Sequence, residues 1–201
     1  MNTESKTRKY EKRRRAASEA ETKQRITEAA MKLHGTIGPA RTTIKSIAEQ
    51  AGVQRATVYR HFSDLESLFE ACSAHWFSLN PAPDAGTWAE ISDPVERLRR
   101  GLEDLYAWYG WAEPMLTNIL RDFPHVPEML VRRQAFQARF AVYVEVLARG
   151  HSERGRARKR MTAAITHAVS FPTWFSLTRE NGLKDAEAIE LMTAMVAAAG
   201  R

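Results

Sequence analysis

Cysteine is nearly absent from the 201-residue sequence, and this scarcity limits the chemistry available to the chain. The single cysteine, Cys72, cannot form a disulfide within the chain, nor can it build a cysteine metal cluster. Such a low cysteine content is typical of proteins in a reducing compartment, and we therefore expect a cytoplasmic protein.

Long apolar runs and strand patterns are also lacking. No uninterrupted apolar stretch approaches the ~18 to 20 residues that span a bilayer, and the chain opens on polar and basic residues that no apolar segment follows. We therefore expect neither a membrane protein nor a secreted one. Alternating β-branched runs closed by Asn-Gly turns are almost missing, so the sequence predicts an all-α fold.

Enzyme signatures are missing as well. The histidines show no His-Glu-x-x-His spacing, and no Gly-x-Ser-x-Gly nucleophile elbow occurs. The run Gly150–Ala157 resembles a phosphate-binding loop only superficially, because it lacks the Lys and the following Ser or Thr and comes after a helix. We expect a protein that is not an enzyme and that has no metal or cofactor.

Acidic residues are scarce in the first third of the chain. Residues 1–62 carry 14 Lys and Arg against 6 Asp and Glu, whereas residues 63–201 carry 16 against 18. The net charges are therefore +8 and −2. A basic first third joined to a nearly neutral remainder indicates that the first third meets a polyanion, although a solvated basic tail explains the charge equally well.

Apolar residues recur at spacings of three and four, which predicts amphipathic helices. Proline, glycine and capping residues mark where these helices begin and end. We expect about nine helices, near residues 26–37, 43–51, 54–61, 63–79, 93–109, 114–123, 127–150, 157–179 and 185–199.

Several boundaries are specific enough to be tested. Ser63 with Glu66 is a capping box that opens a helix burying Leu65. Residues 81–92 form a connector, and Asp93 caps the next helix with a proline at its first position. Pro114 begins a further helix, and Pro172 kinks the one before the last.

The strongest local signal is a pair of short helices between Thr43 and His61. Thr43 can cap the first helix, and Gly52 suits a turn that needs a positive φ. Ala48 allows the two helices to cross closely, as in a helix-turn-helix. The second helix then shows long polar side chains to solvent, and no acidic residue occurs between Gln50 and Ser63. This is typical of a helix that approaches DNA phosphates, whereas an ordinary helical hairpin usually carries acidic residues.

The run Thr42–Phe62, continuing through Ser63–Leu68, closely resembles the DNA-binding domain of the tetracycline-repressor (TetR) family. The resemblance covers about residues 22–75, including the Tyr-x-His-Phe ending at Phe62. It implies a dimeric transcriptional regulator with an N-terminal three-helix DNA-binding domain and a larger helical domain for ligand binding and dimerisation.

The resemblance also implies roles for individual residues. Thr43 contacts a phosphate, and Arg55 and Arg60 are the best candidates for reading guanine, because a guanidinium matches its O6 and N7 acceptors. The remaining candidates lie against the backbone or groove, and for each the alternative is a solvated surface residue: Lys45, Gln54, Thr57, Tyr59 and His61.

Three domains are expected. Residues 1–17 form a disordered basic arm, residues 18–64 the DNA-binding domain, and residues 65–201 the effector-binding and dimerisation domain. Within the arm, six of the eight residues Arg8–Arg15 are basic, so it is either a solvated tail or a segment that becomes ordered along DNA.

Fifteen of the 18 aromatic residues lie after Phe62. Most must belong to the core, but the resemblance implies an effector pocket between helices, which would suit a small apolar or aromatic molecule. The candidate pocket residues are Trp108, Trp111, Phe123, Phe140, Tyr143, His167 and Trp174.

The last two helices are rich in small residues such as Ala163 and Ala194, which permit close helix packing. The resemblance implies that they pair with a second copy, although an internal packing surface is equally compatible with the sequence. We expect a ligand-released repressor that binds double-stranded DNA as a homodimer at a near-palindromic operator. An activator, a ligand-independent regulator and a sequence-independent DNA-binding protein are the alternatives.

Overall fold

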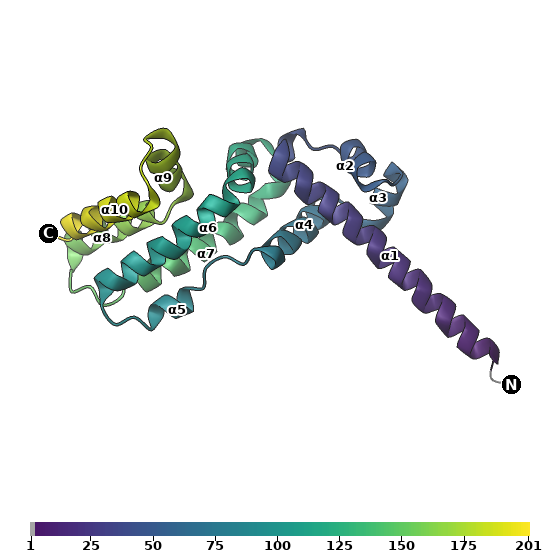
Figure 1. The fold of residues 1–201 in the computed structure, drawn as a ribbon, viewed down its shortest axis with the longest axis horizontal. Helices are drawn as coiled ribbons and strands as arrows, with labels where there is room; N and C mark the ends of the chain where they lie inside the picture. Colours follow the sequence, from purple (N-terminus) through teal and green to yellow (C-terminus); the bar gives the residue numbers. More distant parts are fainter. Residues whose placement is uncertain (1–2) are drawn as a thin grey trace. The chain divides into compact units, whose positions relative to one another are not determined.

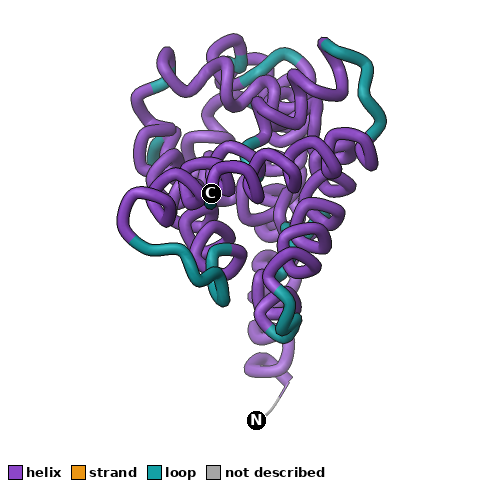
Figure 2. Tube along the Cα trace, turned by 90° about the vertical axis from the view of Figure 1, so that its left-hand side faces the viewer, coloured by secondary structure: helices purple, strands orange, loops and turns teal. Residues whose placement is uncertain are grey.

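The computed structural model describes the backbone of residues 3–201 and the side chains of residues 10–127, 129, 134 and 136–201. The predicted all-α fold is confirmed, because the described residues form ten α-helices and no strand (Figures 1 and 2). The α-helices are α1 (Thr3–Thr36), α2 (Ile44–Ala51), α3 (Arg55–His61), α4 (Leu65–Leu79), α5 (Ala85–Ala89), α6 (Pro94–Asp122), α7 (Leu130–Leu147), α8 (Gly155–Ala168), α9 (Phe171–Phe175) and α10 (Asp185–Ala199). Shorter helical turns are η1 (Pro39–Arg41), η2 (Phe123–His125), η3 (Pro127–Met129) and the π-helical η4 (Ser176–Glu180).

The chain divides into two compact units. Among the described residues, unit 1 comprises residues 3–80 and 117–129, and unit 2 comprises residues 81–116 and 130–201. Helix α6 contributes to both, since its last six residues belong to unit 1. The sequence placed a domain boundary at residue 64, whereas α4 and the end of α6 belong to the same compact unit as the short helices α2 and α3.

Helix α1 includes most of the arm that we expected to be disordered. Its first half is rich in Lys, Arg, Glu and Ala and contains neither glycine nor proline, a composition that favours helix. Residues 10–20 are all solvent-exposed. Residues 1–2 and the side chains of Arg8 and Lys9 lie outside the described part of the chain.

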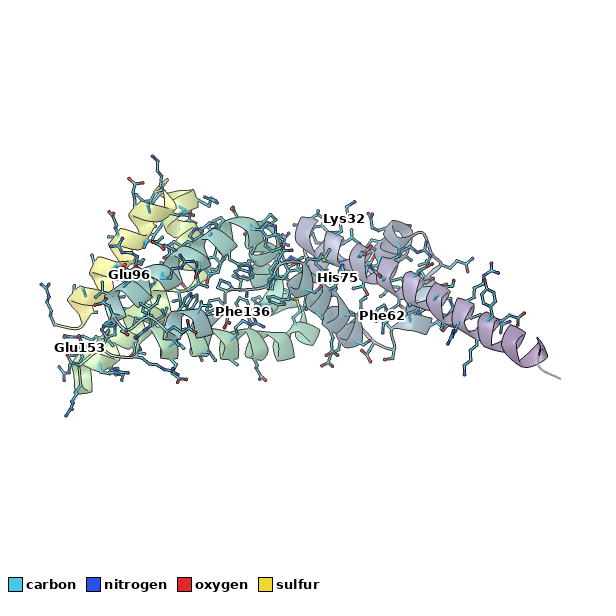
Figure 3. All side chains as sticks on the ribbon, turned by 60° about the horizontal axis from the view of Figure 1, so that its bottom comes forward. Lys32, Phe62, His75, Glu96, Phe136 and Glu153 are labelled. Atoms are coloured by element: carbon cyan, nitrogen blue, oxygen red, sulfur yellow. The ribbon has the colours of Figure 1, made fainter. Side chains whose placement is uncertain are left out.

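The core of unit 1 forms where α1 packs against α2 and α4. Ile26 and Ala30 on α1 are completely buried, as the spacing of three and four predicted. Ile47 from α2 and Val58 from α3 complete the contact, and Phe62 lies beside α1 with the ammonium of Lys23 5.3 Å from its ring centre (Figure 3). These contacts pack the two short helices, α2 and α3, against α1.

The predicted N-cap of α4 is wrong by one residue. Asp64, not Ser63, is the N-cap, and its Oδ1 accepts the backbone N–H of Ser67 at 2.7 Å. A carboxylate is the stronger acceptor for an unpaired helix N–H and also favours the positive end of the helix dipole, so Asp64 prevails over the adjacent serine. Leu65, predicted to be buried, is exposed instead.

Pro114 does not begin a helix but lies inside α6. The apolar face of α6 runs on both sides of it, with Leu105, Tyr109 and Leu116 all buried. Burial of each such side chain is worth ~1.5 to 3 kcal/mol, and together they outweigh the ~3 kcal/mol that an interior proline costs. The expected connector over residues 81–92 likewise contains a short helix, α5, capped by Asp84.

Unit 2 is built around buried aromatic side chains of α6 and α9. The hydroxyls of Tyr106 and Tyr109 donate to the carbonyls of Ala168 and Val169, where α8 ends. The helix that we expected to be kinked at Pro172 is interrupted there, because Ser170 caps a new helix, α9. The last helix has the bounds predicted for it. Residues 3–201 therefore form ten α-helices rather than about nine.

Candidate nucleic-acid interface

The first short helix, α2, is capped as the sequence predicted. Thr43 Oγ1 accepts the backbone N–H of Ser46 at 3.0 Å, and Ser46 Oγ accepts the backbone N–H of Thr43 at 2.9 Å. This reciprocal cap satisfies two backbone donors at the start of the helix. Thr43 itself is exposed.

The turn between α2 and α3 depends on a left-handed glycine. Gly52 has φ 65° and ψ 40°, and the backbone N–H of Val53 donates to the carbonyl of Ala48 at 2.9 Å. Val58 then anchors α3 from beneath, with 1% of its surface exposed. The two helices and their turn therefore have the helix-turn-helix geometry that the sequence indicated.

The outer face of α3 is basic and polar. Gln54, Arg55, Tyr59 and Arg60 are all exposed, Tyr59 by 56%. Lys45 on α2 is also exposed, with its Nζ 3.9 Å from Glu49 Oε1. Exposed donors without acidic neighbours on one short helix are what phosphate and base-edge recognition requires.

Thr57 and His61 are less accessible than the other candidates. Both are half-buried, and His61 Nε2 is buried without a hydrogen-bond partner among the described residues. The sequence placed His61 with the outward-facing donors, but its position at the last turn of α3 directs it partly toward the protein. The remaining candidates are all exposed.

A polar cluster at the end of α6 holds the segment between α1 and α2. Asn118 Nδ2 donates to the carbonyl of Gly35 at 2.9 Å, and Asp122 Oδ2 accepts the backbone N–H of Ala40 at 2.9 Å. Arg121 links these two side chains. It donates to the amide oxygen of Asn118, Oδ1, at 2.8 Å and to the carboxylate oxygen of Asp122, Oδ1, at 2.7 Å. Sequence reasoning missed these residues, because their partners are backbone groups about 80 positions earlier.

The surroundings lower the pKa of two titratable groups in unit 1, His34 and Asp122, for different physical reasons. Burial lowers the pKa of His34 to about 4, only partly opposed by the charge of Asp122. For Asp122, burial alone would raise the pKa, but hydrogen bonds from Arg121 and from the Ala40 backbone bring it below its usual value. Near neutral pH, His34 is therefore uncharged and Asp122 is ionised.

The predicted effector residues separate into groups. Trp108, Tyr109 and Trp174 form a chain of aromatic rings in unit 2, with successive ring centres 5.7 and 5.8 Å apart. Phe140 lies 5.6 Å from Tyr143, a second aromatic contact in the same unit. These contacts bring several of the candidates together.

The other effector candidates are dispersed. Phe123 belongs to the core of unit 1, while Trp111 and His167 are exposed in unit 2. The polar atoms of two candidates are already engaged, since Trp174 Nε1 donates to Asp185 and the Tyr143 hydroxyl donates to the carbonyl of Pro83.

Residues 26–72, which include α2, α3 and about the last third of α1, match the family described as bacterial regulatory proteins, tetR family. This part of the chain is a DNA-binding domain of the TetR family. This family consists of transcriptional regulators, not enzymes, and its members bind DNA and act as dimers. The resemblance noted in the sequence is therefore confirmed.

A known transcriptional regulator is similar in sequence to part of the chain. The HTH-type transcriptional regulator SrpR of Pseudomonas putida is 38% identical over 77 residues, which cover 37% of this chain and 36% of SrpR. The match thus spans about a third of the length of that relative.

Solved TetR-type structures share the fold over nearly the whole chain. A TetR-like transcriptional regulator from Rhodococcus sp. RHA1 has a TM-score of 0.62 at 18% identity, covering 90% of this chain and 97% of that one. NalD of Pseudomonas aeruginosa, a secondary repressor of the MexAB-OprM multidrug efflux pump, has a TM-score of 0.59 at 20% identity, covering 91% and 97%.

A membrane-spanning helix was not expected from the sequence. Over the described residues, no helix combines the length and the apolar character needed to cross a membrane.

Proposed function

We propose that this protein is a sequence-specific transcriptional repressor, which binds a near-palindromic operator as a homodimer and releases it when a small apolar or aromatic molecule binds. The observation that carries the proposal is the outer face of α3. It presents Arg55, Tyr59 and Arg60 to solvent on a helix that is fixed from beneath by Val58 and free of acidic residues.

Each exposed residue has a part in the proposed complex. Arg55 and Arg60 read guanine through paired donors, and each good bidentate contact is worth ~1 to 3 kcal/mol of discrimination. Thr43 and Lys45 at the start of α2 contact phosphates, as Tyr59 and Thr57 do from α3, and Gln54 reads adenine or contacts the backbone. His61, being half-buried, acts at the edge of this surface.

The basic arm at the start of α1 is a further DNA contact in this proposal. Residues 12–15 are all basic and exposed, and phosphate attraction depends chiefly on such charges. As part of a helix, the arm lies along a phosphate backbone rather than threading a groove.

Dimerisation is supported by the surface of the last long helices. Ala163 on α8 and Leu191, Ala194, Ala197 and Ala198 on α10 remain exposed in a single chain, Leu191 by 47%. Two copies also double the number of base contacts, on half-sites one helical turn (~34 to 36 Å) apart.

Release by an effector is supported by the aromatic content of unit 2, where the ring of Trp108 lies 5.7 Å from that of Tyr109 and the ring of Phe140 lies 5.6 Å from that of Tyr143. A ligand releases DNA only to the extent that it prefers the non-binding state, and a coupling of ~1 to 3 kcal/mol suffices for a clear response. NalD, which shares the fold, is a repressor, and this favours repression over activation here.

The first experiment is a fluorescence-anisotropy titration of the full chain against DNA enriched from a random pool, with scrambled DNA in parallel, at two salt concentrations. The proposal predicts a preference of at least ~10³-fold, steep salt dependence and two protomers per site. Equal weak binding to both DNAs would indicate sequence-independent binding and contradict it.

The same assay tests release and the sign of regulation. A panel of hydrophobic and aromatic compounds should include some that lower operator affinity at least ~10-fold, in line with the coupling above. Operator occupancy that raises transcription in a purified system would identify an activator instead. Affinity unchanged by every compound would identify a ligand-independent regulator.

A further inference from the structure

The connection between α7 and α8, together with the first six residues of α8, is strongly basic. Five of the seven residues from Arg154 to Arg160 are Arg or Lys. This stretch belongs to unit 2, whereas the recognition surface on α3 belongs to unit 1. We call residues 149–160 the basic segment.

The exposed residues of the basic segment are either cationic or small. None of them is acidic, aliphatic or aromatic. The basic segment therefore shares with α3 the lack of any exposed acidic residue. The exposed residues are Arg149, Gly150, Ser152, Arg154, Gly155, Arg156, Lys159 and Arg160.

The one acidic residue of the basic segment is turned inward. Glu153 is half-buried, and its Oε1 would be 2.8 Å from a Cβ added to Gly200, at the end of α10 (Figure 3). Among the described residues, no carboxylate oxygen lies within 4.0 Å of a side-chain nitrogen of Arg154, Arg156 or Lys159. The charges of these three residues are therefore directed to solvent without a counter-charge.

Hydrogen bonds within unit 2 hold the backbone of the basic segment. Arg97 on α6 is 5% exposed, and its Nη1 donates to the carbonyl of Arg149 at 2.6 Å. Arg158 is half-buried, and its Nη1 donates to the carbonyl of His151 at 3.3 Å. Two arginines thus shape the segment, and the exposed ones project from a backbone that is already ordered. Such preorganisation lowers the entropy cost of binding.

The start of α8 adds backbone donors to these charges. Arg154 occupies the N-cap without a side-chain cap bond, and the first turn has no acidic residue. The first N–H groups of a helix lack partners within it and attract anions. At 100° per residue, Arg156, Lys159 and Arg160 share one side of α8. Basic side chains here oppose the helix dipole, a conflict that is expected where a surface serves recognition.

We propose that the basic segment binds the phosphate backbone of double-stranded DNA without reading its sequence. Arg154, Arg156 and Lys159 contact phosphates, and the exposed Gly155 lets the DNA backbone approach the start of α8 closely. This second DNA-binding surface goes beyond the recognition of an operator through α3. Because phosphate contacts carry no sequence information, it raises the affinity for operator and for other DNA alike.

The composition of the basic segment favours DNA over other polyanions. Interfaces with proteins are enriched in aromatic residues at their centre, and helices that lie on a membrane insert apolar side chains. The exposed part of the basic segment has neither. Protein–DNA interfaces are more polar and more positively charged, and arginine binds phosphate through two parallel hydrogen bonds.

The test compares two full-length variants of equal charge. Arg156→Gln with Lys159→Gln neutralises the basic segment. The control, Arg99→Gln with Lys184→Gln, also removes one Arg and one Lys at exposed positions of unit 2. Arg99 is ~200° around α6 from Arg97, and Lys184 precedes α10, whose other end lies beside the start of α8.

The measurement is the affinity of each protein for scrambled duplex DNA, by fluorescence anisotropy at salt concentrations from about 50 to 200 mM. Each phosphate contact contributes ~0.9 to the slope of log affinity against log salt. Losing two contacts should therefore reduce the slope by ~1.8, so that wild type loses ~10-fold more affinity over this range than the neutralised variant. The control should match wild type, and both variants should keep the wild-type ratio of operator to scrambled affinity.

A neutralised variant with the wild-type salt slope, or a control whose slope falls equally, would overturn the proposal and leave operator preference intact. Tighter binding of labelled polyglutamate than of DNA through the same two residues would also overturn it, because the partner would then be an acidic protein. A wild type without operator preference would contradict the proposed function but not this proposal, which is measured on scrambled DNA.

Sedimentation velocity on the same samples checks that the substitutions act through DNA alone. Wild type and both variants should have the same oligomeric state. A change confined to the neutralised variant would assign Arg156 and Lys159 to a contact between subunits and would overturn their proposed role with DNA.

Discussion

Asp122, the last residue of α6, accepts a hydrogen bond from the backbone N–H of Ala40 over 2.9 Å, although 82 residues separate the two. Arg121 holds the same carboxylate and also donates to the carbonyl of Ile37 at 3.1 Å. The segment that enters the helix-turn-helix is therefore fixed by side chains from the end of α6. Helix α2 starts four residues after Ala40, so this anchor helps to set where the DNA-facing helices begin.

Removing the Asp122 carboxylate tests that anchor. Asp122→Ala leaves the Ala40 N–H without its acceptor in a site where Asp122 is 3% exposed, and should lower the free energy of unfolding by about 1 to 3 kcal/mol. Urea denaturation followed by circular dichroism measures the change. Glu103→Ala, at an exposed position of the same helix, is the control and should stay within about 0.5 kcal/mol of wild type. Equal stability of the two variants would show that the contact is not an anchor.

Two glycines should respond to alanine in opposite directions. Gly52 has φ +65° with open space around an added Cβ, so Gly52→Ala should destabilise by about 1 to 2 kcal/mol through backbone strain alone. Gly110 is an exposed residue of α6 whose added Cβ would meet only Trp174 at 4.0 Å, so Gly110→Ala should stabilise by about 0.5 to 1 kcal/mol. Thermal unfolding of both variants provides the comparison. A neutral Gly52→Ala would mean that the turn does not need its left-handed residue.

Stability should depend on the protonation of His34. Its ring stacks on Phe69 with centres 4.8 Å apart, its Nδ1 lies 3.5 Å from Cys72 Sγ, and burial lowers its pKa to about 4. Because the folded-state pKa is below the unfolded value of 6.5, the unfolded state binds the proton more readily. The stabilisation is complete above pH 6.5 and is lost as the pH falls from there toward 4, by an amount on the order of 3 kcal/mol.

His34→Phe provides the measurement for that pH dependence. It keeps an aromatic ring beside Phe69 and removes the titrating group, so the difference from wild type should shrink or reverse in favour of the variant as the pH falls from 6.5 to 4. Parallel urea titrations at several pH values measure it. Identical pH profiles for the two proteins would contradict the assignment to His34.

The sequence was sufficient for the features that depend on local chemistry. Thr43 as a cap, Gly52 as a turn residue and the bounds of α10 follow from neighbouring residues, and the structure confirms them. The cap of α4 was misplaced because Ser63 and Asp64 are adjacent acceptors of similar local preference. Pro114 locally favours a helix start, because an interior proline disrupts a helix, but burial along α6 prevails.

The features that could not be predicted depend on contacts between distant segments. Asn118, Arg121 and Asp122 bind backbone groups of the α1–α2 connection, and backbone partners leave no trace in the identity of those residues. The half-buried position of His61 likewise depends on how α3 lies on its neighbours. Aromatic residues such as Phe123 were candidates for a pocket because composition does not distinguish a core ring from a ligand contact.

The most direct test of the account compares operator preference between wild type and Arg55→Ala, with the exposed Arg99→Ala as the matched control. The measurement is the ratio of dissociation constants for the enriched operator and for scrambled DNA, at one fixed salt concentration. The account predicts a wild-type ratio of at least ~10³, a fall of ~5- to 100-fold in Arg55→Ala, and no change in Arg99→Ala. A wild-type protein that binds both DNAs equally, or an Arg55→Ala variant with the wild-type ratio, would contradict recognition through α3.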